Sequence, residues 1–258
     1  MNRRGFLGRS GLASLAPLTS AQAQEKPKSL LITSASSRLA QSLADGLRDR
    51  YAIRLTERVP VRTDHQFVHC ELSHDRSTQL AVQGVRAIVH VAEPLAGASG
   101  GQQVDYQTRC TYNLLTAASE EGVPRVVLLS TLDLMTPYDP TFTVGESWSP
   151  RPVPEPRVLA RHLCEYTARE FAREGRVTIV TLRLGHVVKA EEVKDQPFDP
   201  LWLEERDMIQ AVAGALEAKV DNPWSVFHIQ AESPRARFTV ARAKSALGYQ
   251  PRYLGGSR

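Results

Sequence analysis

The sequence predicts an α/β fold in which a parallel sheet is covered by helices on both faces. Short apolar runs alternate with amphipathic helical patterns along the chain, and this alternation is typical of a doubly wound parallel sheet. The 258 residues contain no internal repeat and no long low-complexity linker, so one domain is expected. The predicted strands are 30–32, 53–55, 67–68, 87–91, 126–129 and 178–184, and the longest helical patterns cover 106–121 and 158–174.

Residues 1–23 have the pattern of a twin-arginine export signal. Arg3 and Arg4 precede a weakly apolar stretch at 11–18, and Ala21-Gln22-Ala23 follows as a cleavage pattern. A disordered basic N-terminus is the alternative. The apolar stretch is too short to cross a bilayer, which needs about 20 apolar residues. We therefore expect a periplasmic or secreted protein without a membrane span, whose single domain covers residues 29–253.

The first strand, at 30–32, leads through a tight turn into a helical pattern. Leu39, Leu43 and Leu47 recur every four residues, and the next strand ends on Glu57, about twenty residues beyond the turn. A strand, a tight turn, a helix and a second strand ending in an acid form the Rossmann unit that seats a dinucleotide. The sequence therefore predicts a Rossmann-type nucleotide site at this turn.

The turn lacks the three glycines that such a unit uses to approach a pyrophosphate. Ser34, Ser37 and Ala40 stand in those positions. Each added Cβ occupies space or restricts φ, although the two hydroxyls can donate to a phosphate. NAD or NADP binding is therefore left open by the sequence.

Charge and cysteine content exclude several classes of function. Three arginines of the signal account for most of the net charge of +4, so the remaining surface is nearly neutral and does not favour nucleic acid. Cys70, Cys110 and Cys164 are an odd number at no metal-ligand spacing, so a disulfide framework is not expected. The seven histidines form no His-x-x-x-His pair, and we expect no metal site.

Several stretches along the chain are typical of one family in their order and spacing. They are Cys70–Leu72, Gly84–Ala92, Thr111–Ala118, Arg125–Thr131, Leu182–Gly185 and Ala243–Pro251. With the Rossmann unit, they make residues 29–253 resemble the extended short-chain dehydrogenases/reductases of the NAD-dependent epimerase/dehydratase family, in a compact uronate dehydrogenase-like form. This resemblance implies that residues 201–253 form a small C-terminal substrate-side lobe.

The resemblance also assigns roles to individual positions. It implies that Glu57 lies near the adenosine ribose of the cofactor and that Glu71 lies near the adenine. It also implies that Thr131 provides the catalytic hydroxyl. A solvated strand-end acid is the alternative for Glu57. Gln107 replaces the asparagine that the family usually has before Thr111. The implied cofactor-binding positions are Thr33, Ser34, Ser37, Arg38, Leu39, Glu57, Glu71, Leu72, Val91 and Gln107.

Arg157 and Arg161 stand where the family has its catalytic tyrosine and lysine. Arginine, with a pKa above about 12, cannot serve as the proton-transfer group that the tyrosine provides. Tyr138 is the only substitute that the sequence offers. The two arginines, four residues apart on one helical face, either clamp an anion or are solvated and pair with Glu155 and Glu165.

Three functions follow from this pattern. The first is an exported binding protein that has lost hydride transfer and binds at most a nucleotide or an anionic sugar. The second is an active NAD(P)-dependent epimerase or dehydrogenase for a sugar or uronate, with tightly held cofactor. The third is an oligomeric scaffold whose helices at 106–121 and 158–174 form a homodimer face, as in the family. Trp202, Trp224 and Phe227 either stack on a sugar or pack in the core.

Overall fold

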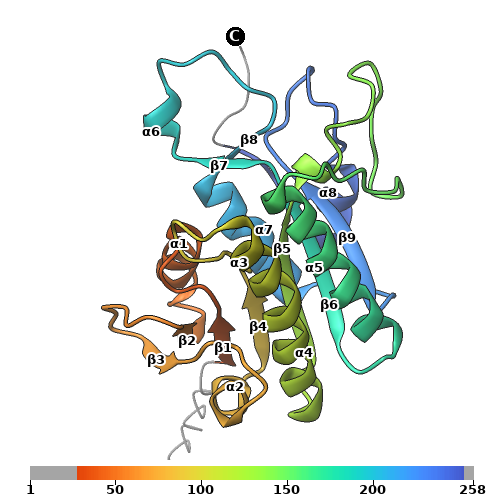
Figure 1. Cartoon of the computed structure of the whole chain (residues 1–258). Coiled ribbons are helices and arrows are strands. Elements are labelled where there is room, and N and C mark those ends of the chain that lie inside the picture. The colour runs from red at the N-terminus through yellow and green to blue at the C-terminus, as the bar shows by residue number, and fades with distance from the viewer. Residues whose placement is uncertain (1–27, 253–258) are drawn as a thin grey trace, which may run out of the picture.

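The computed structural model describes residues 28–252 and confirms the α/β fold (Figure 1). A seven-stranded sheet has the order β3-β2-β1-β4-β5-β6-β9, and every neighbouring pair is parallel. The order reverses at β1, as in a doubly wound sheet. The strands are β1 (Lys28–Ile32), β2 (Tyr51–Glu57), β3 (Gln66–His69), β4 (Ala87–His90), β5 (Arg125–Thr131), β6 (Thr178–Leu184) and β9 (Trp224–Ile229).

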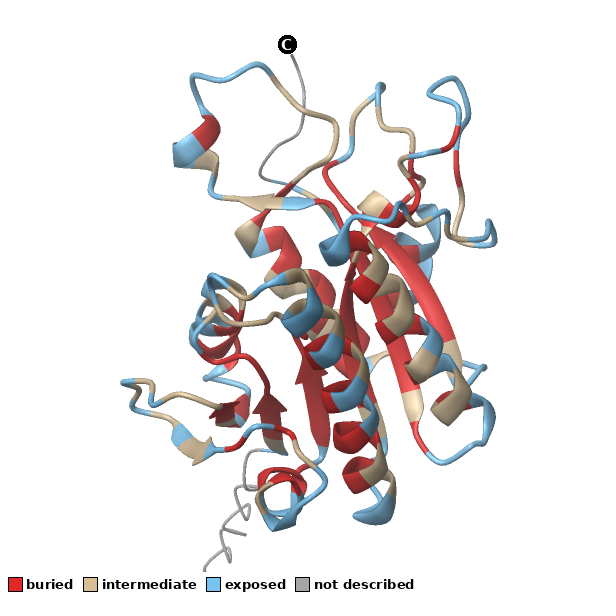
Figure 2. Ribbon diagram, viewed as in Figure 1, coloured by how far each residue is buried: buried red, intermediate tan, exposed pale blue. Residues whose placement is uncertain are grey.

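Helices cover both faces of this sheet, and two hydrophobic cores lie between the layers (Figure 2). Alternate residues of a strand point to opposite faces, so Leu30 and Ile32 enter one core and Leu31 enters the other. The first core packs under α1 (Arg38–Leu47), α7 (Glu205–Glu217) and α8 (Ala241–Leu247). The second packs under α2 (Arg76–Val82), α4 (Thr111–Glu120) and α5 (Pro156–Arg173), and α3 (Gly100–Asp105) lies beside α5.

The longest helix, α5, has a start that its sequence explains. The Glu155 carboxylate accepts hydrogen bonds from the amides of Arg157 and Val158, and Pro156 takes the first helical position. A proline fits there because its missing N–H would have no partner within the helix. These two features fix where the helix begins and place Arg157 in its first turn.

Residues 201–252 contribute more to the main fold than the expected small lobe. Strand β9 joins the sheet at its β6 edge, and α7 packs against α1. Outside the main sheet, β7 (His186–Val188) pairs with β8 (Trp202–Glu204), with the short helix α6 (Ala190–Val193) between them. A third hydrophobic cluster lies beyond the strand ends and joins the loop after β5 to Phe238. The part of the molecule beyond the carboxyl ends of the strands is therefore built from several loops and short elements.

Three further expectations can be compared with the structure. Phe227 is buried in the first core and Trp224 packs against the second, which favours core packing over sugar stacking for both. All three cysteines are buried free thiols. Within residues 28–252, no helix is long and apolar enough to cross a membrane. The twin-arginine segment at 1–23 lies outside the described residues.

Candidate ligand-binding cleft

A cleft of about 650 Å³ opens at the carboxyl ends of β4, β5 and β6. In doubly wound sheets ligands bind at this edge, next to the point where the strand order reverses. The loop after β4, from Glu93 to Ala98, forms part of the lining, and Leu184–Val187 at the end of β6 forms another. Of the residues expected from the sequence, the cleft brings together Arg38, Leu39, Gln107, Thr131, Arg157 and Arg161.

Arg161 is held against the floor of the cleft by the ends of two strands. Its Nη1 donates to the carbonyl oxygens of Val91 and Leu129, each at 2.8 Å. Burial lowers the pKa of the guanidinium, but an arginine remains charged at neutral pH. The predicted alternative, a pair with Glu165, is wrong because the Glu165 carboxylate binds Arg183.

Arg157 lines the same cleft one helical turn away, as the spacing of four residues predicts. Its expected acidic partner, Glu155, uses its carboxylate to cap α5. Within residues 28–252, the Arg157 guanidinium makes no hydrogen bond or ion pair, and the residue is exposed. Its charge is therefore available to a ligand.

Gln107 reaches the cleft from a π-helical turn, Tyr106–Cys110, between α3 and α4. Single π turns in helices often occur at functional sites. The Gln107 Oε1 and the Ser130 Oγ are both buried, and neither has a hydrogen-bond partner in the described protein. Since buried polar atoms are nearly always paired, these two atoms mark the floor of the cleft as polar and unsatisfied.

A buried chain of hydrogen bonds holds the Gln107 turn in place. The His90 ring lies 2.9 Å from the Thr33 Oγ1 on one side and 2.9 Å from the Thr111 Oγ1 on the other. The Thr33 Oγ1 accepts from the Val91 amide, and the Thr111 hydroxyl donates to the Gln107 carbonyl. Burial lowers the pKa of His90 to about 3, so the ring is neutral. Thr33, which was expected to bind the cofactor, is thus buried and uses its hydroxyl for hydrogen bonds within the protein.

His186 and Asp133 form a pair beside Thr131 that the sequence did not reveal. The His186 Nε2 lies 3.1 Å from the Asp133 Oδ1, and its Nδ1 lies 3.7 Å from the Asp199 Oδ2. The Thr131 Oγ1 accepts from the Asp133 amide. The hydrogen bond to Asp133 raises the pKa of His186, and the same bond lowers the pKa of Asp133. His186 directly follows Gly185 after a strand, which was the available signal.

The Asp133→Asn substitution is expected to lower the pKa of His186 toward its ordinary value of 6.5. A raised folded-state pKa means that the His186 contribution to stability is present below the unfolded pKa and is lost as the pH rises through the folded pKa. Asp133 behaves oppositely: its contribution is lost as the pH falls through its lowered pKa. Histidine NMR titration measures the shift. Asp199→Asn is the control. Because Asp199 lies farther from the His186 ring than Asp133 does, this substitution should lower the pKa of His186 by less. A larger decrease than with Asp133→Asn would contradict the pairing of His186 with Asp133.

The serine-rich turn holds the conformation that glycine usually supplies. Ser34 has φ +59°, a value that costs a side-chain-bearing residue free energy. Its Oγ accepts from the Glu93 amide at 3.0 Å and lies 3.1 Å from the Tyr106 hydroxyl, which compensates for the strain. The Ser37 Oγ accepts from the Ala40 amide as the N-cap of α1. Both hydroxyls are therefore already hydrogen-bonded.

Glu57 lies at the end of β2, as predicted, but the turn binds its carboxylate. Oε2 accepts from the Ser36 hydroxyl at 2.7 Å and from the Ser36 amide at 3.2 Å, and Oε1 accepts from the Arg58 amide at 2.8 Å. The residue is 4% exposed, so the predicted solvated acid is wrong. Ser36 offers Glu57 the same kind of hydroxyl that a ribose would offer.

Glu71, expected near the adenine, and the cofactor-binding positions Leu72 and Val91 are not part of the cleft lining. Leu72 is buried in the second core with φ +52°, and its carbonyl accepts from the Asn113 side chain. Glu71 is exposed, and Val91 is buried. Tyr138, the predicted substitute for the missing tyrosine, is also excluded: its hydroxyl donates to the Ser149 carbonyl at 2.7 Å, and it does not line the cleft.

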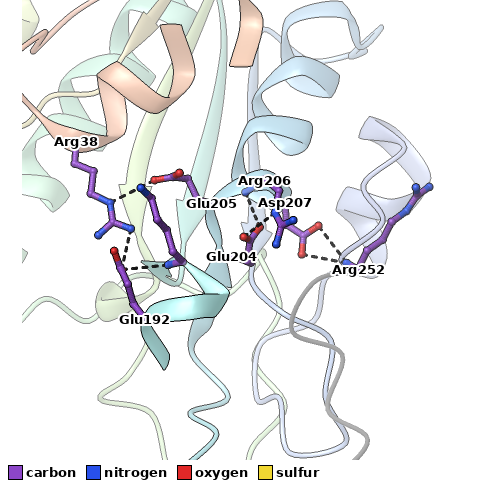
Figure 3. A network of polar contacts seen from close by, with 8 residues as sticks. Arg38, Glu192, Glu204, Glu205, Arg206, Asp207 and Arg252 are labelled. Atoms are coloured by element: carbon purple, nitrogen blue, oxygen red, sulfur yellow. Dashed lines mark hydrogen bonds and ion pairs between the residues drawn. The ribbon is translucent and has the colours of Figure 1, made fainter. Parts of the chain in front are cut away.

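Arg38, at the start of α1, is joined by ion pairs to α6 and α7 (Figure 3). Its Nη2 lies 3.0 Å from Glu192 of α6, and its Nε lies 3.3 Å from Glu205 of α7. Nearby, Glu204 caps α7 and pairs with Arg206, while the Asp207 carboxylate accepts from the Arg252 amide. The two Arg38 pairs connect the N-terminus of α1 to α6 and to the start of α7.

The lining residues suit the phosphate of a nucleotide but do not include the tyrosine–lysine pair. Arg38 and Leu39, whose amides open α1, face the cleft, which suits a phosphate. The titratable side chains of the lining are those of Arg38, Glu93, Arg157, Arg161 and His186. The lining contains no tyrosine or lysine, so the family's proton-transfer pair has no counterpart there. Within residues 28–252, no cluster of side chains could hold a metal ion.

The strand order, the helices on both faces and the cleft at the reversal of strand order define a doubly wound, Rossmann-type protein. The model of the NAD dependent epimerase/dehydratase family matches residues 23–200. The chain belongs to this family, which confirms the resemblance inferred from the sequence.

Known proteins similar to this chain include sugar dehydrogenases. An NAD-dependent glucose-6-phosphate dehydrogenase from Haloferax volcanii is 22% identical over 243 residues, covering 86% of this chain and 92% of the relative. A short-chain dehydrogenase/reductase superfamily protein from Agrobacterium tumefaciens with bound NAD is 20% identical, with a TM-score of 0.75 over 87% of this chain and 92% of that one. Uronate dehydrogenase from the same organism is 21% identical, with a TM-score of 0.73 and coverages of 87% and 84%.

Proposed function

We propose that this protein is an exported member of its family that binds a small anionic sugar, or a related nucleotide, and has lost hydride transfer. The observation that carries the proposal is the placement of Arg157 and Arg161 in one cleft, at the two positions where the family has tyrosine and lysine. Guanidinium groups bind carboxylates and phosphates through several N–H donors, but they do not exchange protons at neutral pH.

The balance of charge in the cleft supports an anionic ligand. Glu93 is the only carboxylate among the lining residues, and Arg38 is already paired with Glu192 and Glu205. Arg157 makes no ion pair in the described part of the chain, and Arg161 donates only through Nη1 to the strand carbonyls. Two guanidinium groups thus retain N–H donors for a ligand.

The names of the relatives favour the same class of ligand. One is named for glucose 6-phosphate and another for a uronate. Each of these sugars carries a carboxylate or a phosphate. An anionic sugar would therefore suit both the charge of this cleft and the ancestry of the chain.

Isothermal titration with glucuronate and glucose 6-phosphate, with neutral glucose as the reference, tests the proposal. We expect binding of at least one anion, and we expect Arg157→Leu to weaken it about tenfold, because a charge-assisted hydrogen bond contributes about 1.5–3 kcal/mol. Arg173→Leu is the matched control, since Arg173 is exposed and pairs with Glu170 away from the cleft. Equal loss of affinity in both variants would contradict the role of Arg157.

Protein taken from its native host tests export and cofactor loss together. An N-terminus at Gln24 would support export, and an intact N-terminus would oppose it. Mass spectrometry of the molecules released on denaturation would show whether a dinucleotide is held. Released NAD or NADP, with reduction of the cofactor by a uronate or sugar phosphate, would favour the active enzyme and contradict the loss of hydride transfer.

A further inference from the structure

We infer that the ligand enters the cleft with a hydroxyl-bearing end against Gln107, Ser130 and Arg161, the cleft floor, and with its anionic group at Arg157. The inference rests on the proposed function and adds the orientation of the ligand and the chemistry that the floor selects. It begins from the two buried atoms without partners, the Gln107 Oε1 and the Ser130 Oγ.

These atoms belong to side chains that are almost fully buried and line the same cleft. Gln107 is 1% exposed and Ser130 is 6% exposed. An unpaired buried acceptor costs free energy that a suitably placed donor recovers. A ligand that supplies the missing hydrogen bonds would therefore gain affinity from the floor, after a small rotation of either side chain toward the cleft.

The donor and acceptor chemistry of the floor selects a hydroxyl. The Gln107 Oε1 only accepts hydrogen bonds, whereas the Arg161 guanidinium only donates them. The Arg161 Nη1 binds two strand carbonyls, and its other N–H groups make no hydrogen bond to the described protein. A sugar hydroxyl carries both a donor for Gln107 and an acceptor for Arg161. A carboxylate cannot donate, so it is better placed at Arg157.

The floor is preorganised by groups that do not line the cleft. His90 links Thr33 of the first turn to Thr111 of α4, and the Thr111 hydroxyl donates to the Gln107 carbonyl at 2.8 Å. This chain fixes the π-helical turn and hence the base of the Gln107 side chain. A rigid acceptor binds a hydroxyl with less loss of conformational entropy than a flexible one.

The Gln107→Leu substitution tests the inference, because leucine has a similar size and no acceptor. Glucuronate and cyclohexanecarboxylate are the two probes: both are ring carboxylates, but only the first carries hydroxyls. We expect Gln107→Leu to weaken the binding of glucuronate about tenfold and to leave the binding of cyclohexanecarboxylate unchanged. Arg157→Leu should weaken the binding of both probes. Gln79→Leu is the matched control, since Gln79 is an exposed residue of α2 outside the cleft lining.

Ser130→Ala is the second variant, because it removes the other unpartnered atom without adding volume. It should weaken the binding of glucuronate several-fold and leave the melting temperature of the protein unchanged or higher. The inference is overturned if Gln107→Leu and Ser130→Ala leave the affinity for glucuronate unchanged. It is also overturned if they lower the affinity for both probes equally. A wild-type protein that binds neither probe nor glucose 6-phosphate would instead contradict the proposed function.

Discussion

Glu165→Leu is expected to lower the free energy of unfolding by about 3–5 kcal/mol, because it would leave the Arg183 charge buried without a partner. The Arg183 Nε and Nη2 donate to the two Glu165 oxygens at 2.9 and 2.7 Å. The side chains are only 4% and 5% exposed, so water cannot replace the lost carboxylate. Urea denaturation followed by circular dichroism measures the change.

Two controls separate this effect from a general loss of charge. Glu170→Leu removes the partner of the exposed Arg173 and should change stability by less than about 1 kcal/mol. The double variant Glu165→Leu/Arg183→Met removes both charges and should recover much of the stability that the single variant loses, since an apolar pair can replace a buried ion pair. A single variant as stable as the wild type would show that the pair does not contribute.

Gly185→Ala is expected to lower the free energy of unfolding by about 3 kcal/mol and to disturb the cleft. A Cβ at this position would overlap the Leu201 carbonyl oxygen, which belongs to the backbone and cannot rotate away. The Gly185 amide donates to the Ile229 carbonyl, and the His186 amide donates to the Leu201 carbonyl. Displacing Leu201 would therefore move β7, β8 and His186 together. Thermal unfolding and anion titration measure the two consequences.

Gly101→Ala is the matched control for this substitution. Gly101 lies in α3, and a Cβ there would meet no atom within 4 Å. Since alanine favours the helix over glycine by about 0.5–1 kcal/mol, this variant should be as stable as the wild type or slightly more stable. If Gly185→Ala proved equally harmless, the close approach of Leu201 to β6 would not be a constraint on the fold.

The strands of the main sheet were predictable where apolar residues form short uninterrupted runs. Residues 87–91 and 178–184 are buried on both faces of a parallel sheet, and such strands are recognisable from composition. Strand β9 was missed because nothing local in Trp224–Ile229 indicates that it pairs with β6, more than 40 residues earlier. Pairing between distant strands depends on how the intervening helix α7 packs.

The cleft was predictable in outline for a similar reason. Thr131 ends a strand, and Arg157 and Arg161 share one face of the next helix, so the edge of the sheet brings them together. His186 was missed because its position after the stretch Leu182–Gly185 is a weak signal and the sequence does not show its partners. Its partners Asp133 and Asp199 come from two other loops, and only the folded chain brings them within reach.

Local patterns in the sequence thus predicted the fold class, the family, the position of the cleft and the absence of a tyrosine–lysine pair. They did not predict which groups the polar side chains bind. Glu57 binds the hydroxyl of Ser36, Arg161 binds the ends of β4 and β5, and Glu165 binds Arg183 instead of an arginine of its own helix. Hydrophobic periodicity is a property of neighbouring residues, whereas a hydrogen bond between distant residues forms only when the packed elements bring both groups within about 3 Å.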